Sequence, residues 1–181
     1  VIEYYGPGVI NLSATDREAI GNMGTELGAT SSIFPSDEST RVYMEAQDRG
    51  QDWTPLYPDD DALYDETTEI DLSSLEPLIA CPSSPGNVVP VREVAGKPVD
   101  QVIIGSCANS SFRDLMVAAK MLEGRHCHPS VSFHINPGSR QVIENITAQG
   151  GILPLLKAGA RIHESGCLGC IGMGQAPGTG Q

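Results

Sequence analysis

The sequence predicts an α/β protein with two lobes, whose sheets are largely parallel and flanked by helices. Short apolar runs alternate with helical patterns through the second half of the chain, and strand–helix alternation of this kind predicts a parallel sheet covered by helices. The chain has 181 residues and 40% hydrophobic content, which suits a globular protein. A Pro-rich stretch at residues 81–90 separates the halves. We therefore expect a smaller α/β lobe at residues 1–90 and a three-layer α/β/α lobe at residues 91–181.

The first predicted helix follows a short strand at residues 1–5. Ser13 and Thr15 are possible N-caps, and Asp16 stands in the first turn, where the positive end of the helix dipole favours an acid. Gly28 would end this helix, because glycine readily adopts the left-handed conformation that closes a helix C-terminus. We therefore expect the helix to extend to the residue before that glycine.

The rest of the first half gives a second helix and one more strand. We expect the second helix at residues 36–48, beginning at Ser36 after a proline. The acidic tract at residues 59–61 is typical of a solvated loop. The alternation of apolar and polar residues at 67–72 predicts a strand.

The second half shows a clearer pattern. We expect strands at 100–105, 131–135 and 160–162, and helices at 111–123, 138–149 and 153–158. Reactive loops of parallel sheets lie beyond the carboxyl ends of their strands. Cys107 and Cys167 each follow one of the predicted strands, so both are candidates for a functional site.

The charge of the chain limits the partners that it could bind. Its formal net charge is −12, with 11 Lys and Arg against 23 Asp and Glu. Nucleic-acid surfaces need clustered Lys and Arg, so we expect no nucleic-acid partner. Sites for di- or tricarboxylates use convergent Arg side chains, whereas the arginines here are few and scattered. If the substrate is an organic acid, we expect the residues that bind its carboxylates to lie outside this sequence.

Three further features concern the setting of the protein. No apolar run reaches the roughly 18 residues of a membrane-spanning helix, so we expect no membrane partner. Five cysteines, an odd number, argue against a closed set of disulfides and favour a reducing, cytoplasmic location. The sequence has no initiator Met and no closing element at its end, so we expect it to be an internal fragment of a longer protein.

The cysteines form the most informative pattern. Cys167 and Cys170 make a C-x-x-C pair, and Cys107 lies 60 positions before the first of them. A structural zinc site would need a fourth ligand, such as His163, and a thioredoxin-like redox pair would not need Cys107. An iron–sulfur cluster with three cysteine ligands would leave one iron open. The cysteines could equally be small buried side chains, and spacing alone leaves these alternatives open.

Five segments, in this order along the chain, resemble the aconitase family, whose members include isopropylmalate and homoaconitate hydratases. They are N-M-G-T-E-L-G-A-T at residues 22–30, continued by S-I-F-P at 32–35, E-I-D-L-S-S-L-E-P at 69–77, G-S-C-A-N-S at 105–110, P-G-S at 137–139 and G-C-L-G-C-I-G at 166–172. The chain departs from the family's G-S-C-T-N-S at Ala108 and from its C-G-P-C-I-G at Leu168-Gly169. The resemblance covers essentially the entire sequence.

This resemblance implies that Cys107, Cys167 and Cys170 bind a [4Fe–4S] cluster with one open iron, which acts as a Lewis acid on the substrate. The other cysteines and the histidines have no counterpart in the family motifs. We interpret them as structural or surface residues: Cys81, Cys127, His126, His128, His134 and His163.

The resemblance also implies roles for three polar residues. Asn22 and Glu26 lie four positions apart, hence on one face of the predicted helix, and the family places residues at these positions near the open iron. By residue pattern alone they would be an ordinary solvent-exposed polar face. Asn109 would make hydrogen bonds around the cluster or the substrate.

The implied activity belongs to a longer parent enzyme. It would be a hydro-lyase that interconverts citrate and isocitrate through aconitate, a substrate choice that S-I-F-P favours. Family members draw Asp–His pairs, substrate-binding arginines and a catalytic serine on a swivelling domain from segments absent here. We therefore expect the isolated chain to be inactive and to need the rest of the enzyme as its partner. The alternatives are a hydratase of the isopropylmalate or homoaconitate type, and a non-catalytic zinc or iron–sulfur module.

Overall fold

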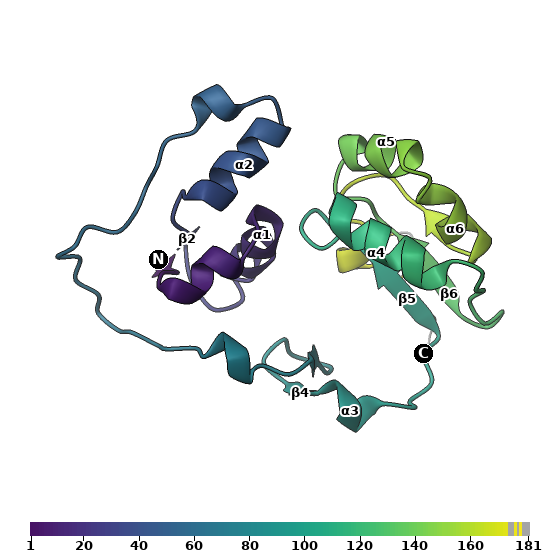
Figure 1. Cartoon of the computed structure of the whole chain (residues 1–181). Helices are drawn as coiled ribbons and strands as arrows, with labels where there is room; N and C mark the ends of the chain where they lie inside the picture. Colours follow the sequence, from purple (N-terminus) through teal and green to yellow (C-terminus); the bar gives the residue numbers. More distant parts are fainter. Residues whose placement is uncertain (174–175, 177, 179–181) are drawn as a thin grey trace. The chain divides into compact units, whose positions relative to one another are not determined.

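The computed structural model describes residues 1–173, 176 and 178. The chain divides into two compact units, Val1–Lys97 and Pro98–Gln181, called unit 1 and unit 2 below (Figure 1). The α/β fold class is confirmed, because the described residues form helices and three sheets, of which two are parallel and one is antiparallel. No helix in the described part of the chain is long and apolar enough to cross a membrane.

Unit 1 contains two small sheets and several short helices. In chain order its elements are β1 (Ile2–Glu3), η1 (Pro7–Asn11), α1 (Ala14–Asn22), β2 (Ser32–Ile33), α2 (Glu38–Ala46), η2 (Gly50–Asp52), η3 (Leu72–Ser74), β3 (Leu78–Ala80), β4 (Val88–Pro90) and α3 (Val91–Val94). β1 runs parallel to β2, and next to this pair the rings of Tyr4 and Phe34 stack at 4.4 Å. β3 and β4 form an antiparallel hairpin.

Helix α1 begins as predicted but ends early. Ser13 is its N-cap and forms a capping box with Asp16, in which each side chain accepts a hydrogen bond from the other's backbone N–H. The helix ends at Asn22 rather than continuing to residue 27, because glycines disfavour helix from this point on. A Cβ atom added at Gly24 would clash with the hydroxyl of Ser32 at the start of β2 and would lie 3.1 Å from the carbonyl of Gly21, so a larger residue here would force the serine side chain to turn away.

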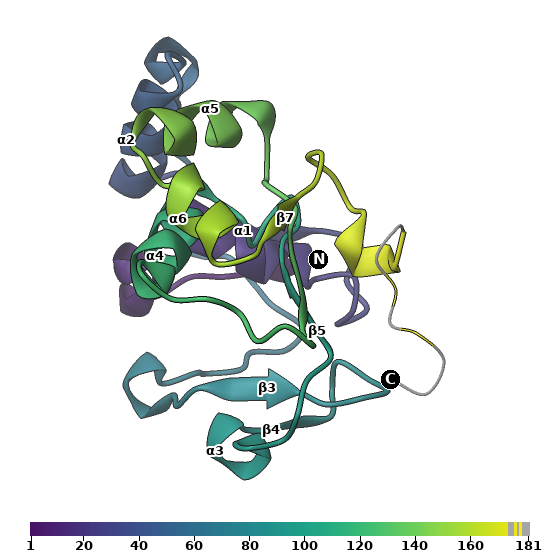
Figure 2. The same cartoon turned by 90° about the vertical axis from the view of Figure 1, so that its right-hand side faces the viewer.

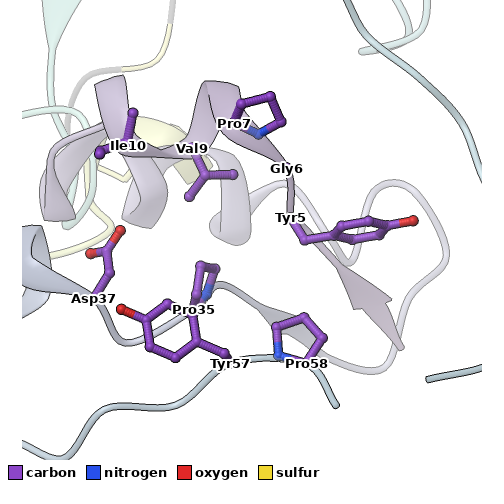
Figure 3. Close-up of a pocket in the computed structure, with 9 residues that line it drawn as sticks. All are labelled: Tyr5, Gly6, Pro7, Val9, Ile10, Pro35, Asp37, Tyr57 and Pro58. Carbon is purple, nitrogen blue, oxygen red and sulfur yellow. The ribbon is translucent and has the colours of Figure 1, made fainter. Parts of the chain in front are cut away.

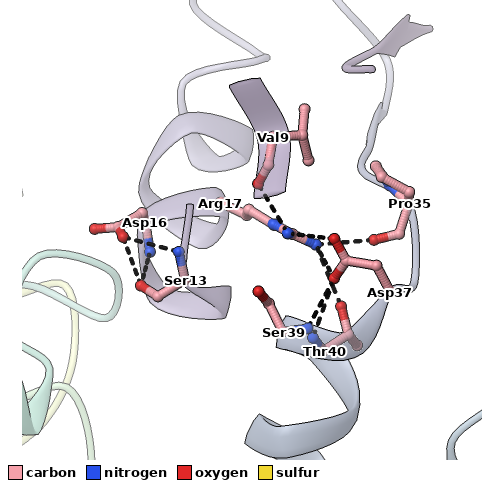
Figure 4. Close-up of polar contacts among 8 residues, drawn as sticks. All are labelled: Val9, Ser13, Asp16, Arg17, Pro35, Asp37, Ser39 and Thr40. Carbon is pink, nitrogen blue, oxygen red and sulfur yellow. Dashed lines mark hydrogen bonds and ion pairs between the residues drawn. The ribbon is translucent and has the colours of Figure 1, made fainter. Parts of the chain in front are cut away.

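A buried ion pair joins α1 to α2 (Figure 4). The guanidinium of Arg17 donates to both carboxylate oxygens of Asp37 at 2.7 and 2.8 Å. It also donates to the backbone carbonyls of Val9 and Pro35, each at 3.0 Å. Arg17 is only 5% exposed, so these bonds are largely shielded from water. This contact, missed in the sequence, connects the start of the chain to α2.

The same carboxylate starts helix α2. Asp37 is the N-cap and accepts hydrogen bonds from the backbone N–H groups of Ser39 and Thr40, so the prediction that the helix opens at Ser36 was one residue early. The pKa of Asp37 is lowered chiefly by the hydrogen bonds from Arg17. The backbone hydrogen bonds from Thr40 and Ser39 lower it further. Asp37 therefore stays ionised and serves both the ion pair and the helix cap.

The end of unit 1 holds one wrong prediction and one hairpin that was not predicted. Residues 67–72 form no strand; the segment is exposed and leads into the 3-10 turn η3, where Asp71 accepts a hydrogen bond from Ser73 N–H. Without a neighbouring strand to pair with, an alternating pattern does not make a sheet. The Pro-rich stretch at 81–90 is also more than a separator, because it holds the turn and second strand of the β3–β4 hairpin.

Unit 2 follows the predicted alternation closely. Its elements are β5 (Gln101–Ile104), α4 (Phe112–Leu122), β6 (Ser132–Ile135), α5 (Arg140–Ala148), α6 (Ile152–Lys157), β7 (Arg161–Ile162) and η4 (Gly169–Ile171). The three strands form a parallel sheet in the order β5-β6-β7, with β6 in the centre. The predicted helices and strands of this half are confirmed to within one or two residues at their ends.

The two faces of this sheet differ in chemistry. One face packs against the helices: Leu115, Ile135, Ile146 and Leu155 are fully buried in a shared core. Helices α4, α5 and α6 all contact one another, and Figure 2 shows them together beside the sheet. Of the three layers predicted for this lobe, the described residues supply the sheet and one layer of helices. Because side chains alternate along a strand, the opposite face of β6 carries polar residues, including His134.

Candidate metal centre

Cys107 lies in the loop that follows β5, and the loop alternates between buried and exposed residues. Ser106, Ala108 and Ser110 are buried, whereas Cys107 and Asn109 are exposed. The hydroxyl of Ser106 donates a hydrogen bond to the Cys107 sulfur at 3.8 Å. The segment therefore buries its small side chains and leaves the thiol and the amide exposed.

Cys167 and Cys170 lie in the loop that follows β7. The sulfur atoms of Cys107 and Cys167 are 4.0 Å apart, although 60 residues separate them in the chain. Cys170 lies one turn further on, in η4, and all three cysteines are exposed. The carboxyl ends of parallel strands meet at one edge of a sheet, and this topology brings two of the three predicted ligands together.

The Cys107 thiol influences the ionisation of Cys167. The hydrogen-bonding contact with Cys107 is the largest cause that raises the pKa of the Cys167 thiol, and Cys170 adds a smaller contribution of the same sign. Two thiolates this close repel each other, so the protonated form is favoured. A bound cation would reverse this preference, because metals bind thiolates and displace the protons.

The donor set suits a metal centre that prefers sulfur. Three thiols on exposed loops match the ligands of iron–sulfur clusters and of zinc. In the described part of the chain, however, no three His, Cys, Asp or Glu side chains converge tightly enough to hold one metal ion. The sulfurs of Cys107 and Cys167 are thus adjacent, and Cys170 lies near enough to Cys167 to help raise its pKa. A [4Fe–4S] cluster fits this donor set by its chemistry, and the ligand assignment stays a prediction.

The central strand β6 holds both cysteine loops. On one side Asn136 N–H donates to the Ile104 carbonyl at 2.8 Å, at the end of β5, and Gly138 N–H donates to the carbonyl of Ser110 at 3.0 Å. On the other side the Asn136 amide donates to the carbonyl of Glu164 at 3.3 Å, three residues before Cys167. Asn136 is completely buried. The residues at the exit of β6 therefore fix where both cysteine loops begin.

Gly105→Ala is expected to disturb this arrangement. A Cβ atom at Gly105 would lie 2.9 Å from the Cβ of Asn136, closer than two carbon atoms pack, so one of the strand ends must move. We expect a loss of stability of about 1–3 kcal/mol in unit 2 and a lower yield when a bifunctional thiol reagent bridges Cys107 and Cys167. Gly86→Ala is the control, because its Cβ would meet only Ser84 Oγ at 3.6 Å. A wild-type yield in Gly105→Ala would contradict the expectation.

The predicted polar site residues are all exposed. Asn109 lies two residues after Cys107 in the same loop, and both are exposed. Asn22 and Glu26 belong to unit 1, and the prediction that they share one helical face was wrong, because α1 ends at Asn22 and Glu26 lies in the turns that follow. The glycine-rich sequence after Asn22 breaks the helix before Glu26 is reached.

A hollow of about 530 Å³ lies in unit 1 (Figure 3) but holds none of the predicted site residues. Among its lining residues Asp37 is the one with a charge, and its carboxylate already pairs with Arg17. It offers no cationic group for an organic acid. The hollow is therefore not a candidate for the site of such a substrate.

Charge is distributed unevenly between the units. Unit 2 has five Asp and Glu against six Lys and Arg, so the excess of acids that makes the chain −12 lies entirely in unit 1. The cysteine-bearing unit is therefore close to neutral and does not repel an anionic substrate strongly.

Sequence reasoning missed a pair of histidines in unit 2. His134 and His163 were interpreted as structural or surface residues, yet their rings share a hydrogen bond. The sequence offered one hint of this pair: His134 lies within a predicted strand and His163 directly follows another. Neither position reveals a pairing until the register of β6 and β7 is known.

The comparisons with known proteins agree with the motifs. The family model for the aconitase family (aconitate hydratase) matches residues 1–181. The chain is 42% identical over 172 residues to 3-isopropylmalate dehydratase large subunit 2 of Rubrobacter xylanophilus, which covers 95% of this chain and 40% of that protein. It is 43% identical over 171 residues to large subunit 1 of Methanopyrus kandleri, with 94% and 41% covered.

A third relative extends the same finding. The chain is 37% identical over 174 residues to 3-isopropylmalate dehydratase large subunit 1 of Thermotoga maritima, with 95% of this chain and 42% of that protein covered. The chain thus spans about two fifths of the length of the curated relatives it matches. Since the family model matches from the first residue to the last, this chain belongs to the aconitase family.

Proposed function

We propose that this chain is the cluster-binding part of a hydro-lyase that removes water from a hydroxy acid. The observation that supports this most directly is the approach of Cys107 and Cys167 to 4.0 Å from the ends of two strands of one sheet. The relatives are named dehydratases, which is the same class of reaction. Cys170 is the third ligand in this proposal, by its place in the family motif.

The chemistry divides between the cofactor and the chain. A [4Fe–4S] cluster with three cysteine ligands would supply an open iron that polarises a hydroxyl and makes it a better leaving group. Asn109, which is exposed two residues after Cys107, would donate amide hydrogen bonds around the cluster or the substrate. In this proposal Glu26 hydrogen-bonds the reacting hydroxyl of the substrate and Asn22 helps to orient it.

For the substrate, we propose an acid of the 3-isopropylmalate type. All three relatives named above are called 3-isopropylmalate dehydratase large subunits. The segment S-I-F-P favoured citrate by resemblance to aconitases, and citrate is therefore the alternative. The word "large" in those names points to a second, smaller subunit, which we propose as a partner together with the remainder of the large subunit.

Anaerobic reconstitution with iron and sulfide tests the cofactor. The expected result is a brown protein with visible cluster absorbance and about four irons per chain, as a [4Fe–4S] cluster requires. Binding of one zinc per chain, with no retention of iron after desalting, would overturn the hydro-lyase proposal.

One observation favours a zinc-stabilised module as the second candidate. A tetrahedral zinc ion with Zn–S distances of about 2.3 Å holds two sulfurs about 3.8 Å apart. The distance between Cys107 and Cys167 is close to this value, at 4.0 Å. Competition between zinc and iron in the same reconstitution therefore separates the two candidates.

A chimera tests the substrate. Because the chain aligns over 172 residues with the Rubrobacter xylanophilus relative, it can replace the corresponding segment of that large subunit. With the matching small subunit, the chimera is expected to dehydrate 3-isopropylmalate, measured by the ultraviolet absorbance of the unsaturated acid. Turnover of citrate with no turnover of 3-isopropylmalate would favour the alternative. The same chimera with Glu26→Gln is expected to lose most of its turnover while it retains iron.

A further inference from the structure

The polar face of the unit 2 sheet holds a connected row of side chains. His134 Nε2 lies 2.6 Å from the Ser132 hydroxyl, and His134 Nδ1 lies 2.8 Å from Nε2 of His163. The two imidazole rings are 5.0 Å apart at their centroids. Because His134 is only 2% exposed, this hydrogen bond is largely shielded from water.

The hydrogen bond between the two rings depends on their protonation. One of the facing nitrogens must carry a hydrogen and the other a lone pair. This holds when both rings are neutral, and also when the pair carries one positive charge. When both rings are protonated, both facing nitrogens carry hydrogens, so the bond is lost and two positive charges stand side by side.

The surroundings of His134 oppose that doubly protonated state. On the same face of the sheet, β7 contributes Arg161 and the residue after it contributes His163, whereas the register partner on β5 is Ile103, which is apolar. Burial is the largest cause that lowers the pKa of His134 below its ordinary value of 6.5, followed by repulsion from His163 and Arg161. The charged and titratable groups that face His134 thus act in one direction.

His163 begins the loop that carries Cys167. Its backbone N–H donates to the carbonyl of Ile135 at 2.8 Å, and the next residue, Glu164, accepts from the Asn136 amide. The imidazole bond to His134 is the third attachment of this loop to β6. Of these three attachments it is the one that acid can break, because the backbone and side-chain amide groups of the other two do not titrate in this range.

We propose that His134 and His163 are positioning residues that hold the Cys167 loop against β6 and release it in acid. In the proposed function they would keep the Cys167 thiol beside Cys107, ready for a shared metal centre. Only this role of the tether, to prepare a metal centre, rests on the proposed function. The tether itself is a property of the metal-free protein.

The test measures the approach of the two thiols without any metal. Dibromobimane, which bridges neighbouring thiols, is applied to the apoprotein between about pH 5 and 8, the range in which histidine titrates. Tryptic mass spectrometry then gives the fraction of alkylated Cys107 that is bridged to Cys167. His163→Gln is the matched variant, because its amide keeps a hydrogen-bonding group at the same place and does not titrate.

The quantity compared is the bridged fraction of the wild type divided by the bridged fraction of His163→Gln at the same pH. We expect this ratio to be about three- to fivefold lower at pH 5 than at pH 8, because the wild type loses one hydrogen bond in acid. Division by the variant removes the pH dependence of thiol reactivity, which both proteins share. His163→Ala is expected to bridge poorly at every pH. Identical curves for the wild type and His163→Gln would overturn the proposal, as would wild-type bridging in His163→Ala.

A second measurement serves if the variants do not fold. Amide hydrogen exchange of residues 163–167 in the wild type, corrected for the intrinsic rate at each pH, is expected to lose protection only toward about pH 5 and below, because the bond breaks when the second ring takes up a proton. Constant protection would overturn the proposal. Reconstitution with iron tests the proposed function separately. If the thiols are bridged as expected but no cluster binds, the proposed function is refuted and the tether between His134 and His163 stands.

Discussion

Arg17→Met is expected to lower the free energy of unfolding of unit 1 by about 3 kcal/mol, the low end of what the loss of one partner of a buried ion pair costs. The substitution leaves the Asp37 carboxylate and the carbonyls of Val9 and Pro35 without the guanidinium that now donates to all of them. The carboxylate keeps its hydrogen bonds to the first turn of α2. For this reason we expect the low end of the range.

Trp53 makes this effect measurable in unit 1 alone. It is the one tryptophan of the chain, and it lies in unit 1. Urea unfolding followed by its fluorescence therefore reports on that unit. Arg49→Met is the control, because Arg49 pairs with Asp52 at 3.1 Å but is 66% exposed, so its loss should shift the midpoint by only a small fraction as much. Equal shifts in the two variants would refute the assignment of Arg17.

The same ion pair predicts a loss of stability in acid. The pKa of Asp37 is lowered from 3.8 in the folded chain, chiefly by its hydrogen bonds with Arg17. Its contribution to stability is therefore complete above about pH 4 and is lost as the pH falls through the lowered pKa, because the unfolded chain then takes up a proton more readily. Trp53 fluorescence across an acid titration checks this, and Arg17→Met should show a weaker dependence.

Cys107→Ser is expected to abolish assembly of the cluster, the largest effect on function. Iron retained after anaerobic reconstitution should fall from about four per chain to near zero, because the variant lacks one of only three protein ligands. Cys167→Ser should behave in the same way, since the two sulfurs lie 4.0 Å apart and act as a pair. Visible absorbance and iron analysis give the measurement.

Cys127→Ser is the matched control within unit 2. Cys127 is half-buried and packs against the hydrophobic core rather than lying in either loop. The control should retain iron even if it loses some stability. Full iron in Cys107→Ser, or its complete loss in Cys127→Ser, would show that the three-cysteine assignment is wrong.

The sequence predicted unit 2 far better than unit 1, for physical reasons. In unit 2 the longer helices α4 and α5 both begin at serine N-caps, and in α4 Ser111 and Asp114 form a capping box ahead of a clear apolar stripe. In unit 1 the alternating residues 67–72 found no partner strand, and the hairpin at residues 78–90 was hidden by its prolines. Strand formation depends on pairing with distant residues, which local patterns do not record.

The candidate site shows the same limit. The motifs pointed to Cys107 and Cys167, but only the order β5-β6-β7 brings them within 4.0 Å. The tethers to β6 through Asn136 and His134 were missed, because no residue pattern distinguishes a histidine that bonds to a neighbouring strand from one that faces solvent. The extent of α1 was misjudged for a simpler reason: the penalty of its glycines was underrated.

The attachment of both cysteine loops to one strand has an evolutionary consequence. The thiol-to-thiol separation is dictated by how β5 and β7 flank β6, and not by how many residues lie between Cys107 and Cys167. Insertions or deletions in the connection from α4 to β6, or between α5 and α6, would lengthen or shorten that interval and leave the thiols where they are. Descendants of this fold are thus free to vary the interval, and a search by fixed spacing between the cysteines would overlook them.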